Sequence, residues 1–368
     1  MAYYQDVVIF LPKGRGIEMI PKGYDIKSLT QNELKALIEE NSHVIDEKLL
    51  EAARSTREQS YGKKVFFRGL IEFSNYCKND CYYCGIRKSN RNVRRYRLTK
   101  KEIIDCCITG YQLGFRTFVL QSGEDLYYTD DFMIDLIGDI KNRFPDSAIT
   151  LSMGEKSYES YKKYFQAGAD RYLLRHETAT KDHYHQLHPK NMNLFTREKA
   201  LYNLKDIGFQ VGAGFMVNSP YQKIDHLVND LLFLKKLNPH MVGIGPFIPH
   251  HDTIFANEKS GTVDMTVLMI ALVRLLLPKA LIPATTALGT IDPYGRERGL
   301  QAGANVVMPN LSPTSIREDY SLYDNKICTG DEAAECKECI SERIRKAGFE
   351  PDFSRGDYGG YCIANVYP

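Results

Sequence analysis

The stretch LGFRTFVLQSG, residues 113–123, shows the unit from which the fold is built. A helical pattern precedes its glycine, and an apolar run with β-branched and aromatic side chains follows within two residues. A glycine that ends a helix in the left-handed conformation, directly before a buried strand, is typical of the loops that lead into parallel sheets. The same arrangement returns at 167–177, 207–216 and 302–310. The chain is therefore expected to alternate helices with parallel strands.

This pattern predicts eight strands, at about 64–73, 116–121, 147–153, 169–175, 209–216, 240–246, 281–287 and 304–309. Helices are expected between them, and Thr99 with Glu102 forms the capping box of one. Eight such units indicate an α/β fold, a single (βα)8 barrel of the TIM type, with its chemistry at the carboxyl ends of the strands. An open, doubly wound sheet is the alternative, but no GxGxxG follows the first strand.

Three regions are expected along the chain. Residues 1–63 contain two amphipathic patterns and are predicted to be a helical extension, 64–310 to be the barrel, and 311–368 to be an irregular, polar extension with three cysteines. The most apolar stretch, 265–283, carries Arg274 in its middle, which argues against a membrane span. It is predicted to be a buried helix that leads into a strand.

Composition excludes several function classes. The net charge of the 368 residues is +2 and both signs are mixed, so neither a nucleic acid nor a membrane surface is an expected partner. The first 14 residues lack the pattern of a secretory signal, so the nine cysteines are expected in a reducing cytoplasm. Six of them form two tight clusters, which favours metal or iron–sulfur ligation. Cys106 and Cys107 fit a buried helix face, and Cys362 has no predicted role.

The first cysteine cluster is NYCKNDCYYCG, residues 75–85, directly after the first predicted strand. Cys77, Cys81 and Cys84 follow the spacing C-x3-C-x2-C. Three thiolates can hold three irons of a cubane 4Fe–4S cluster and leave the fourth iron open to another ligand. The amino and carboxylate groups of S-adenosylmethionine can fill that position, and an electron can then break its S–C5′ bond. Zinc is the alternative, but zinc motifs usually supply a fourth cysteine or nearby histidines.

Polar groups at the other strand ends are candidates for binding the cosubstrate. Gln121, Ser122 and Glu124 lie in the turn QSGED, whose backbone donors and carboxylates suit an amino group, although a plain turn would look the same. Ser152 and Glu155 end the third predicted strand.

Charged side chains mark the end of the fourth predicted strand. Arg175 and Glu177 share one strand face and are predicted to hold the carboxylate and ribose of the cosubstrate, and Arg197 to reach its carboxylate. Arg171 is predicted to clamp a second, anionic substrate, with a structural ion-pair network as the alternative. His183, His185 and His188 are expected on a solvated helix face.

Later strand ends suggest the walls of a deep pocket. Thr285 and Thr286 supply paired hydroxyls, Met308 lies near the rim, and Tyr320 and Tyr323 are expected to fold over the opening. Such a lining suits the containment of a radical and the exclusion of water.

C-x3-C-x2-C after a strand resembles the signature of the radical S-adenosylmethionine superfamily. Tyr83 matches the aromatic position that its members use beside the adenine. FSNYCKNDCYYCGIR, VLQSGEDLYY, GADRYLLRHETA, MVGIGPFIPH and GANVVMPN together resemble the HydE family, the radical maturases of FeFe-hydrogenase, from about residue 64 to 340. One segment departs from that family, GFMVNSPYQKID, where Asn218 and Tyr221 replace smaller residues.

The resemblance implies an enzyme that assembles the hydrogenase diiron cofactor from an iron–carbonyl–cyanide–cysteine precursor, delivered by a sister maturase. Ferredoxin or flavodoxin would supply electrons. It implies that the precursor pocket is lined by Arg171, Met241, Thr285, Thr286, Met308, Tyr320 and Tyr323. Cys328, Cys336 and Cys339 match the ligands of an accessory 2Fe–2S or 4Fe–4S cluster found in some members, with unligated cysteines as the alternative.

Two other functions remain open from the sequence. A radical mutase such as methylornithine synthase would share the cysteine loop and the barrel but act on a free amino acid. A non-catalytic iron–sulfur carrier would need no cosubstrate pocket.

Overall fold

A parallel sheet forms the centre of the computed structural model, which describes residues 25–330 and 333–360. Its strands are β1 (Lys64–Phe67), β2 (Gly69–Ser74), β3 (Thr117–Ser122), β4 (Ala148–Ser152), β5 (Arg171–Leu173), β6 (Gln210–Ala213), β7 (Met216–Val217), β8 (Met241–Val242), β9 (Gly245–Pro246), β10 (Val306–Val307) and β11 (Glu350–Asp352). The order β2-β3-β4-β5-β6-β8 makes one sheet, β10-β1-β11 a second, and β7-β9 a third.

Isolated parallel bridges connect these sheets into one circuit. Met241 pairs with Leu281, Pro283 with Val306, and Leu70 with Asn310, while β10 pairs with β1. Parallel pairing thus passes from the first predicted strand through all eight predicted segments and returns to it. The expected α/β fold with a parallel, barrel-like sheet is confirmed.

The strands differ from the prediction in their continuity. The first is divided at Arg68, between β1 and β2, and β1 pairs on one side with β11 from the far end of the chain. The predicted strand 281–287 makes only isolated bridges, since Pro283 has no N–H for a ladder and a helix begins at Thr286.

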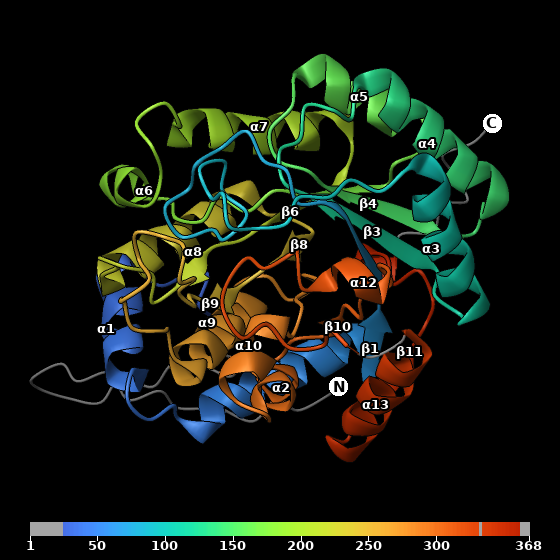
Figure 1. The fold of residues 1–368 in the computed structure, drawn as a ribbon. Helices are drawn as coiled ribbons and strands as arrows, with labels where there is room; N and C mark the ends of the chain where they lie inside the picture. Colours follow the sequence, from blue (N-terminus) through green and yellow to red (C-terminus); the bar gives the residue numbers. More distant parts are fainter. Residues whose placement is uncertain (1–24, 331–332, 361–368) are drawn as a thin grey trace, which may run out of the picture.

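Helices cover the outside of the sheet, as Figure 1 shows for α3, α4, α5 and α7 beside β3, β4 and β6. Their bounds are α1 (Gln31–Asn41), α2 (Glu47–Tyr61), α3 (Lys100–Gln112), α4 (Asp130–Arg143), α5 (Tyr158–Gln166), α6 (Lys181–Leu187), α7 (Leu194–Ile207), α8 (Ile224–Leu237), α9 (Val263–Leu276), α10 (Thr286–Ile291), α11 (Gly295–Gln301), α12 (Thr314–Arg317) and α13 (Ala333–Lys346), with a short 3-10 turn at Tyr358–Gly360.

Three helix predictions are confirmed in detail. Thr99 and Glu102 form the reciprocal capping box at the start of α3, and α1 and α2 occupy the predicted N-terminal helical patterns. The apolar stretch forms the buried α9, where the Arg274 guanidinium binds the carbonyl oxygens of Gly303 and Pro278 at 2.8 and 2.7 Å. Within the described part of the chain, no helix is long and apolar enough to span a membrane.

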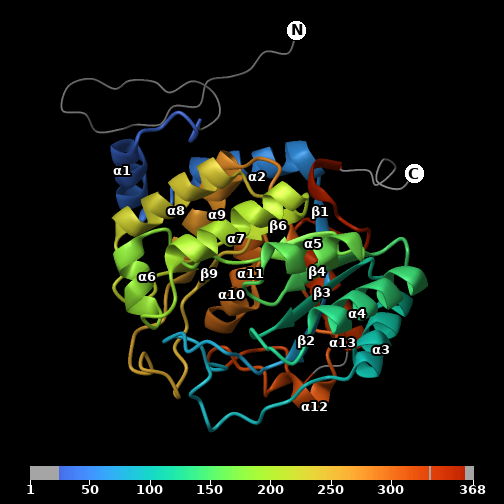
Figure 2. The ribbon, with the colours of Figure 1, turned by 90° about the horizontal axis from the view of Figure 1, so that it is seen from above.

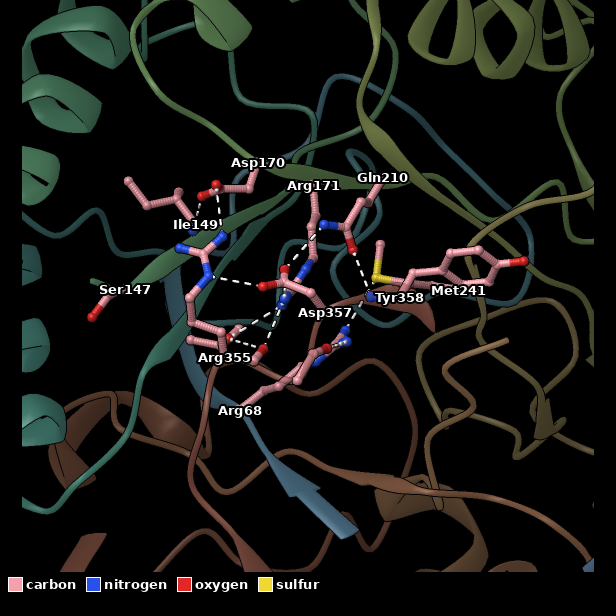
Figure 3. Close-up of polar contacts among 12 residues, drawn as sticks. Arg68, Ser147, Ile149, Asp170, Arg171, Gln210, Met241, Arg355, Asp357 and Tyr358 are labelled. Carbon is pink, nitrogen blue, oxygen red and sulfur yellow. Dashed lines mark hydrogen bonds and ion pairs between the residues drawn. The ribbon is translucent and has the colours of Figure 1, made fainter. Parts of the chain in front are cut away.

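The chain after α13 runs to the end of the barrel opposite the predicted site. After β11 pairs with β1, Asp357 lies beneath the sheet, where its carboxylate accepts from Arg171 Nη2 at 2.6 Å and Arg355 Nε at 2.9 Å (Figure 3). Arg355 also pairs with Asp170 at 3.0 Å. The segment thus brings its own carboxylate to a buried group of arginines.

This placement corrects the expectation that Arg171 clamps a substrate. Arg171 begins β5 and is fully buried, whereas Arg175 follows the end of β5 and lines the cavity. The Arg171 guanidinium therefore lies at the lower end of the barrel, where Asp357 already neutralises it.

The Asp357→Asn variant is expected to lose about 3–5 kcal/mol of stability at pH 7, because it leaves buried guanidinium charge uncompensated. Burial opposes ionisation of Asp357, but Arg171 and Arg355 lower its pKa to about 2. The wild-type advantage is therefore complete above about pH 4 and is lost as the pH falls towards 2.

Urea unfolding at pH 7, 4 and 3 measures this difference. Asp105→Asn removes an exposed partner of Lys101 and is the control, expected to change stability by less than about 0.5 kcal/mol. A pH-independent loss in Asp357→Asn would contradict the electrostatic explanation.

Candidate active site

A cavity of about 340 Å³ opens at the carboxyl ends of the strands. The residues predicted from the sequence that line it are Cys77, Cys81, Tyr83, Cys84, Gln121, Ser122, Glu124, Ser152, Arg175, Glu177, Arg197, Thr285, Thr286, Tyr320 and Tyr323. Figure 2 shows that the segment between β2 and α3, which carries the three cysteines, lies at the end of the molecule away from α1 and α2. The fold thus brings the predicted rim residues of separate strands to one cavity.

The cysteine loop is held by an arginine that the sequence analysis did not identify. The Arg95 guanidinium donates to the carbonyl oxygens of Asn75, Ile86, Arg87 and Asn90, at 2.9, 2.6 and 3.0 Å for the last three. One fixed fork thus ties together both ends of a loop that has no regular structure. The sequence signal for such a role is the density of arginines in RKSNRNVRRYR, residues 87–97. That density does not tell which of the arginines turns inward.

The three cysteines fit a cluster with an open position. None is in a disulfide, and all three line the cavity. The backbone N–H groups of Asn79 and Glu124 point at Cys77 Sγ, at 3.4 Å each, as donors that would stabilise a thiolate. Burial raises the pKa of all three thiols, that of Cys84 to about 12. Buried thiols become ligands when a metal replaces their protons, so this donor set suits iron.

Arg197, on α7, links two carboxylates at one side of the cavity. Its Nε lies 2.7 Å from Glu155 and its Nη2 3.5 Å from Glu124, although Glu155 itself stands behind the cavity lining. Burial would lower the pKa of Arg197, but the two carboxylates raise it well above its usual value. The site therefore keeps a permanent buried cation between two acids.

Arg175 and Glu177 form an ion pair at 2.9 Å and both line the cavity, although they follow the end of β5 rather than sharing a strand face. Glu177 has a positive φ of 67°, which a non-glycine residue seldom adopts. Its backbone is held there because its N–H donates to Gly214 and its carbonyl accepts from Met216. The turn aims a carboxylate and a guanidinium together into the cavity.

Tyr83 is fixed by a histidine that was expected to face solvent. His188 is buried, and its Nδ1–H donates to the Tyr184 carbonyl at 2.9 Å, so its Nε2 accepts from the Tyr83 hydroxyl at 3.2 Å. Burial lowers the pKa of His188 to about 3, which keeps this arrangement neutral. His183 is buried as well, against Thr178 and Pro220, so the predicted solvated face is wrong for both histidines.

Another part of the cavity lining combines hydroxyls with apolar surface. The buried Thr285 Oγ1 has no hydrogen-bond partner among the described residues, and Thr286 Oγ1 accepts from Arg296 at 3.3 Å. Tyr320 is fully buried, and Phe247 and Ile248 add apolar area. An unpaired buried hydroxyl favours a ligand that supplies its partner.

Met241 and Met308 lie below the main cavity. They line a separate void of about 20 Å³ inside the barrel, together with Arg68 and Thr150. Sequence reasoning placed them in the substrate pocket, whereas the structure places them in the layer beneath it.

The accessory cysteines are only partly described. Cys328 is half-buried, with its sulfur 3.6 Å from Arg296, and Cys339 is exposed on α13. The side chain of Cys336 lies outside the described residues, as do Cys362 and the N-terminal stretch. A second cluster therefore stays a prediction.

Gly154→Ala is expected to weaken cosubstrate binding about tenfold, a loss of about 1.4 kcal/mol. Gly154 has φ +74°, and an added Cβ would lie 1.9 Å from Glu124 Cγ, so that the carboxylate beside Cys77 must move. Equilibrium dialysis with S-adenosylmethionine measures the change. Gly138→Ala in α4, which has open space around it, is the control and should bind normally; an equal loss in both variants would contradict the argument.

Comparison with known proteins agrees with this geometry. Residues 71–234 match the model of the Radical SAM superfamily. The chain is 46% identical over 345 residues to the [FeFe] hydrogenase maturase subunit HydE of Thermotoga maritima, covering 94% of this chain and 97% of the relative.

Other relatives are more distant. 3-Methylornithine synthase of Methanosarcina acetivorans is 31% identical, over 91% of this chain and 93% of the relative. The crystal structure of methylornithine synthase (PylB) superposes with a TM-score of 0.78 at 28% identity, over 89% of this chain and 96% of that one. The chain therefore belongs to the radical S-adenosylmethionine superfamily and, within it, to the family of the [FeFe] hydrogenase maturase HydE.

Proposed function

We propose that this enzyme reductively cleaves S-adenosylmethionine and uses the 5′-deoxyadenosyl radical in assembly of the FeFe-hydrogenase diiron cofactor. The observation that carries the proposal is the convergence of three free cysteines, the Arg175–Glu177 pair and Arg197 on one cavity of about 340 Å³. A carrier or scaffold would have no use for charged groups so arranged around an open ligand position.

Each group has a defined task in this scheme. Cys77, Cys81 and Cys84 would hold a 4Fe–4S cluster, which supplies the electron that breaks the sulfonium S–C5′ bond when it is bound and reduced.

The remaining cavity groups would orient the cosubstrate. Tyr83 would lie against the adenine, and Glu177 would accept from ribose hydroxyls. Gln121, Ser122 and Glu124 would receive the amino group, with Ser152 beside them. Arg175 and Arg197 would hold the carboxylate, with Glu155 keeping Arg197 in place.

The second substrate would occupy the part of the cavity that is lined by the threonine pair and the two tyrosines. Thr285 offers an unpaired hydroxyl, and Thr286, Tyr320 and Tyr323 complete a surface with few charges. We infer that it accepts a small iron–carbonyl–cyanide–cysteine complex handed over by a sister maturase. Met241 and Met308 would support this pocket from below, and a low-potential carrier such as ferredoxin or flavodoxin would supply electrons. A cytoplasmic location fits a cluster that oxygen destroys.

A radical mutase of the methylornithine synthase kind is the second candidate, favoured by the superposition at a TM-score of 0.78. The mutase ranks second because the chain is 46% identical to the maturase and 31% identical to the methylornithine synthase. Rearrangement of lysine by the reconstituted enzyme would reverse this order.

The test uses anaerobically reconstituted protein reduced with dithionite. Electron paramagnetic resonance, with and without S-adenosylmethionine, and the deoxyadenosine yield are measured on one sample. The expected result is a cubane signal that changes on addition of the cosubstrate, with deoxyadenosine formed. A loaded cluster that gives neither would favour the carrier.

A further inference from the structure

One face of the molecule beside Cys77 exposes large apolar side chains among basic ones. Leu126 is 71% and Tyr127 59% exposed, in the turn that follows the QSGED motif. Tyr76, Lys78, Lys88 and Arg97 lie on the neighbouring cysteine loop and the segment after it. We call these six residues the Arg97 patch. Neighbouring exposed apolar residues mark an interaction surface more often than a single exposed apolar residue does.

Two residues of the patch, Tyr76 and Lys78, flank the first cluster ligand, Cys77, in the chain. Cys77 Sγ receives the backbone N–H groups of Asn79 and Glu124, both at 3.4 Å. Lys78 N–H donates to the Glu124 carbonyl at 2.9 Å, and Lys88 N–H donates to the Asn79 carbonyl at 2.8 Å. The backbone N–H groups of Lys78 and Lys88 therefore bind Glu124 and Asn79, the two residues whose own N–H groups point at the sulfur.

The patch turns its cations outward and its carboxylates inward. Lys78 is paired with Glu124 at 3.1 Å, but the lysine side chain is 42% exposed and the glutamate 8%. Arg97 is paired with Asp125 at 2.7 Å, with exposures of 34% and 3%. The nearby Asp80 carboxylate is occupied by Arg87 at 2.7 Å. In the Lys78 and Arg97 pairs the basic side chain is therefore the one that a partner protein would meet.

Aromatic rings hold the central cation in place. The Arg97 guanidinium lies 3.7 Å from the centre of the Tyr76 ring and 4.7 Å from that of Tyr127. Arginine and tyrosine are both enriched at the energetic centre of protein–protein interfaces. A basic rim around such a centre fits an acidic partner.

We propose that the Arg97 patch is the docking surface for a small, acidic, one-electron carrier protein, an inference that rests on the proposed function. The carrier loses one electron, the cluster bound at Cys77, Cys81 and Cys84 gains it, and no covalent bond changes. Docking here brings the carrier next to Cys77, whose segment lies at the end of the molecule away from α1 and α2 (Figure 2).

The test is the double variant Lys88→Glu/Leu126→Glu, in the cluster-loaded enzyme. Both side chains are exposed and lie outside the groups assigned to the cavity. The matched control is Lys162→Glu/Val44→Glu, which makes the same kind of change at exposed positions on α5 and between α1 and α2. The probe is a flavodoxin with net negative charge.

Two readouts are measured. Calorimetry gives the affinity for the oxidised flavodoxin, and stopped-flow absorbance gives the rate of cluster reduction by the reduced one. The patch variant is expected to lose about tenfold in both, and the wild-type rate is expected to fall as salt is added. The control variant should behave as wild type, and dithionite-driven deoxyadenosine formation should be unchanged in both.

Equal affinity and rate in the patch and control variants would overturn the proposal. So would an equal loss with flavodoxin and dithionite, because that would place the effect in the cluster rather than in docking. If the wild type binds flavodoxin but forms no deoxyadenosine with either reductant, the proposed function fails and the docking surface stands.

Discussion

Cys84→Ala is expected to abolish the reductive cleavage of S-adenosylmethionine, lowering deoxyadenosine formation to below about a thousandth of the wild-type rate. Cys84 is one of the three ligands that line the cavity, and burial raises the pKa of its thiol to about 12. Two remaining thiolates cannot hold the three irons that leave a fourth one open. Iron content, the paramagnetic resonance signal and deoxyadenosine yield measure the loss.

Cys106→Ala is the matched control. Cys106 is also a buried, free cysteine with a thiol pKa of about 12, but it lies on α3 against the core. Its replacement should leave cluster content and turnover unchanged. If Cys84→Ala kept deoxyadenosine formation, the assignment of the three-cysteine loop to an open cluster would be wrong.

Arg197→Met is expected to cost about 3–5 kcal/mol at neutral pH and to remove measurable cosubstrate binding. The substitution keeps a long side chain but leaves Glu155 and Glu124 without their shared cation. Burial already raises the pKa of Glu155 and Arg197 lowers it, so removal of the guanidinium raises it further. A raised carboxylate pKa destabilises the folded state above that pKa, and protonation relieves the cost.

The loss of stability should therefore be largest near pH 8 and shrink as the pH falls towards 5. Urea unfolding at these two values measures it, and equilibrium dialysis measures binding. Arg197→Met/Glu155→Gln is the control, because it removes one of the two carboxylates that lose their cation. It should recover part of the stability without recovering binding. A penalty that does not change with pH would show that packing, rather than charge, dominates at this position.

Local pattern was enough to predict the parts of the site that lie close together in the sequence. The spacing of Cys77, Cys81 and Cys84 predicts a three-thiolate loop because ligands within eight residues can reach one metal cluster. Arg175 and Glu177 are two residues apart and were expected to lie together; the structure forms the pair at 2.9 Å, in the turn after β5. Helix caps such as Thr99 with Glu102 are local for the same reason.

Only the tertiary structure decided which charges are free to meet a ligand. Arg171 looked available in the sequence, but its partner Asp357 lies 186 residues away and arrives through β11, a pairing that no periodicity encodes. The roles of Arg95 and His188 depend likewise on which carbonyl or hydroxyl the folded chain brings within hydrogen-bond distance. Sequence determined the ligand chemistry, because that depends on residue type and short spacing. Tertiary structure determined charge pairing and burial, because the desolvation that sets them comes from chain segments far apart in sequence.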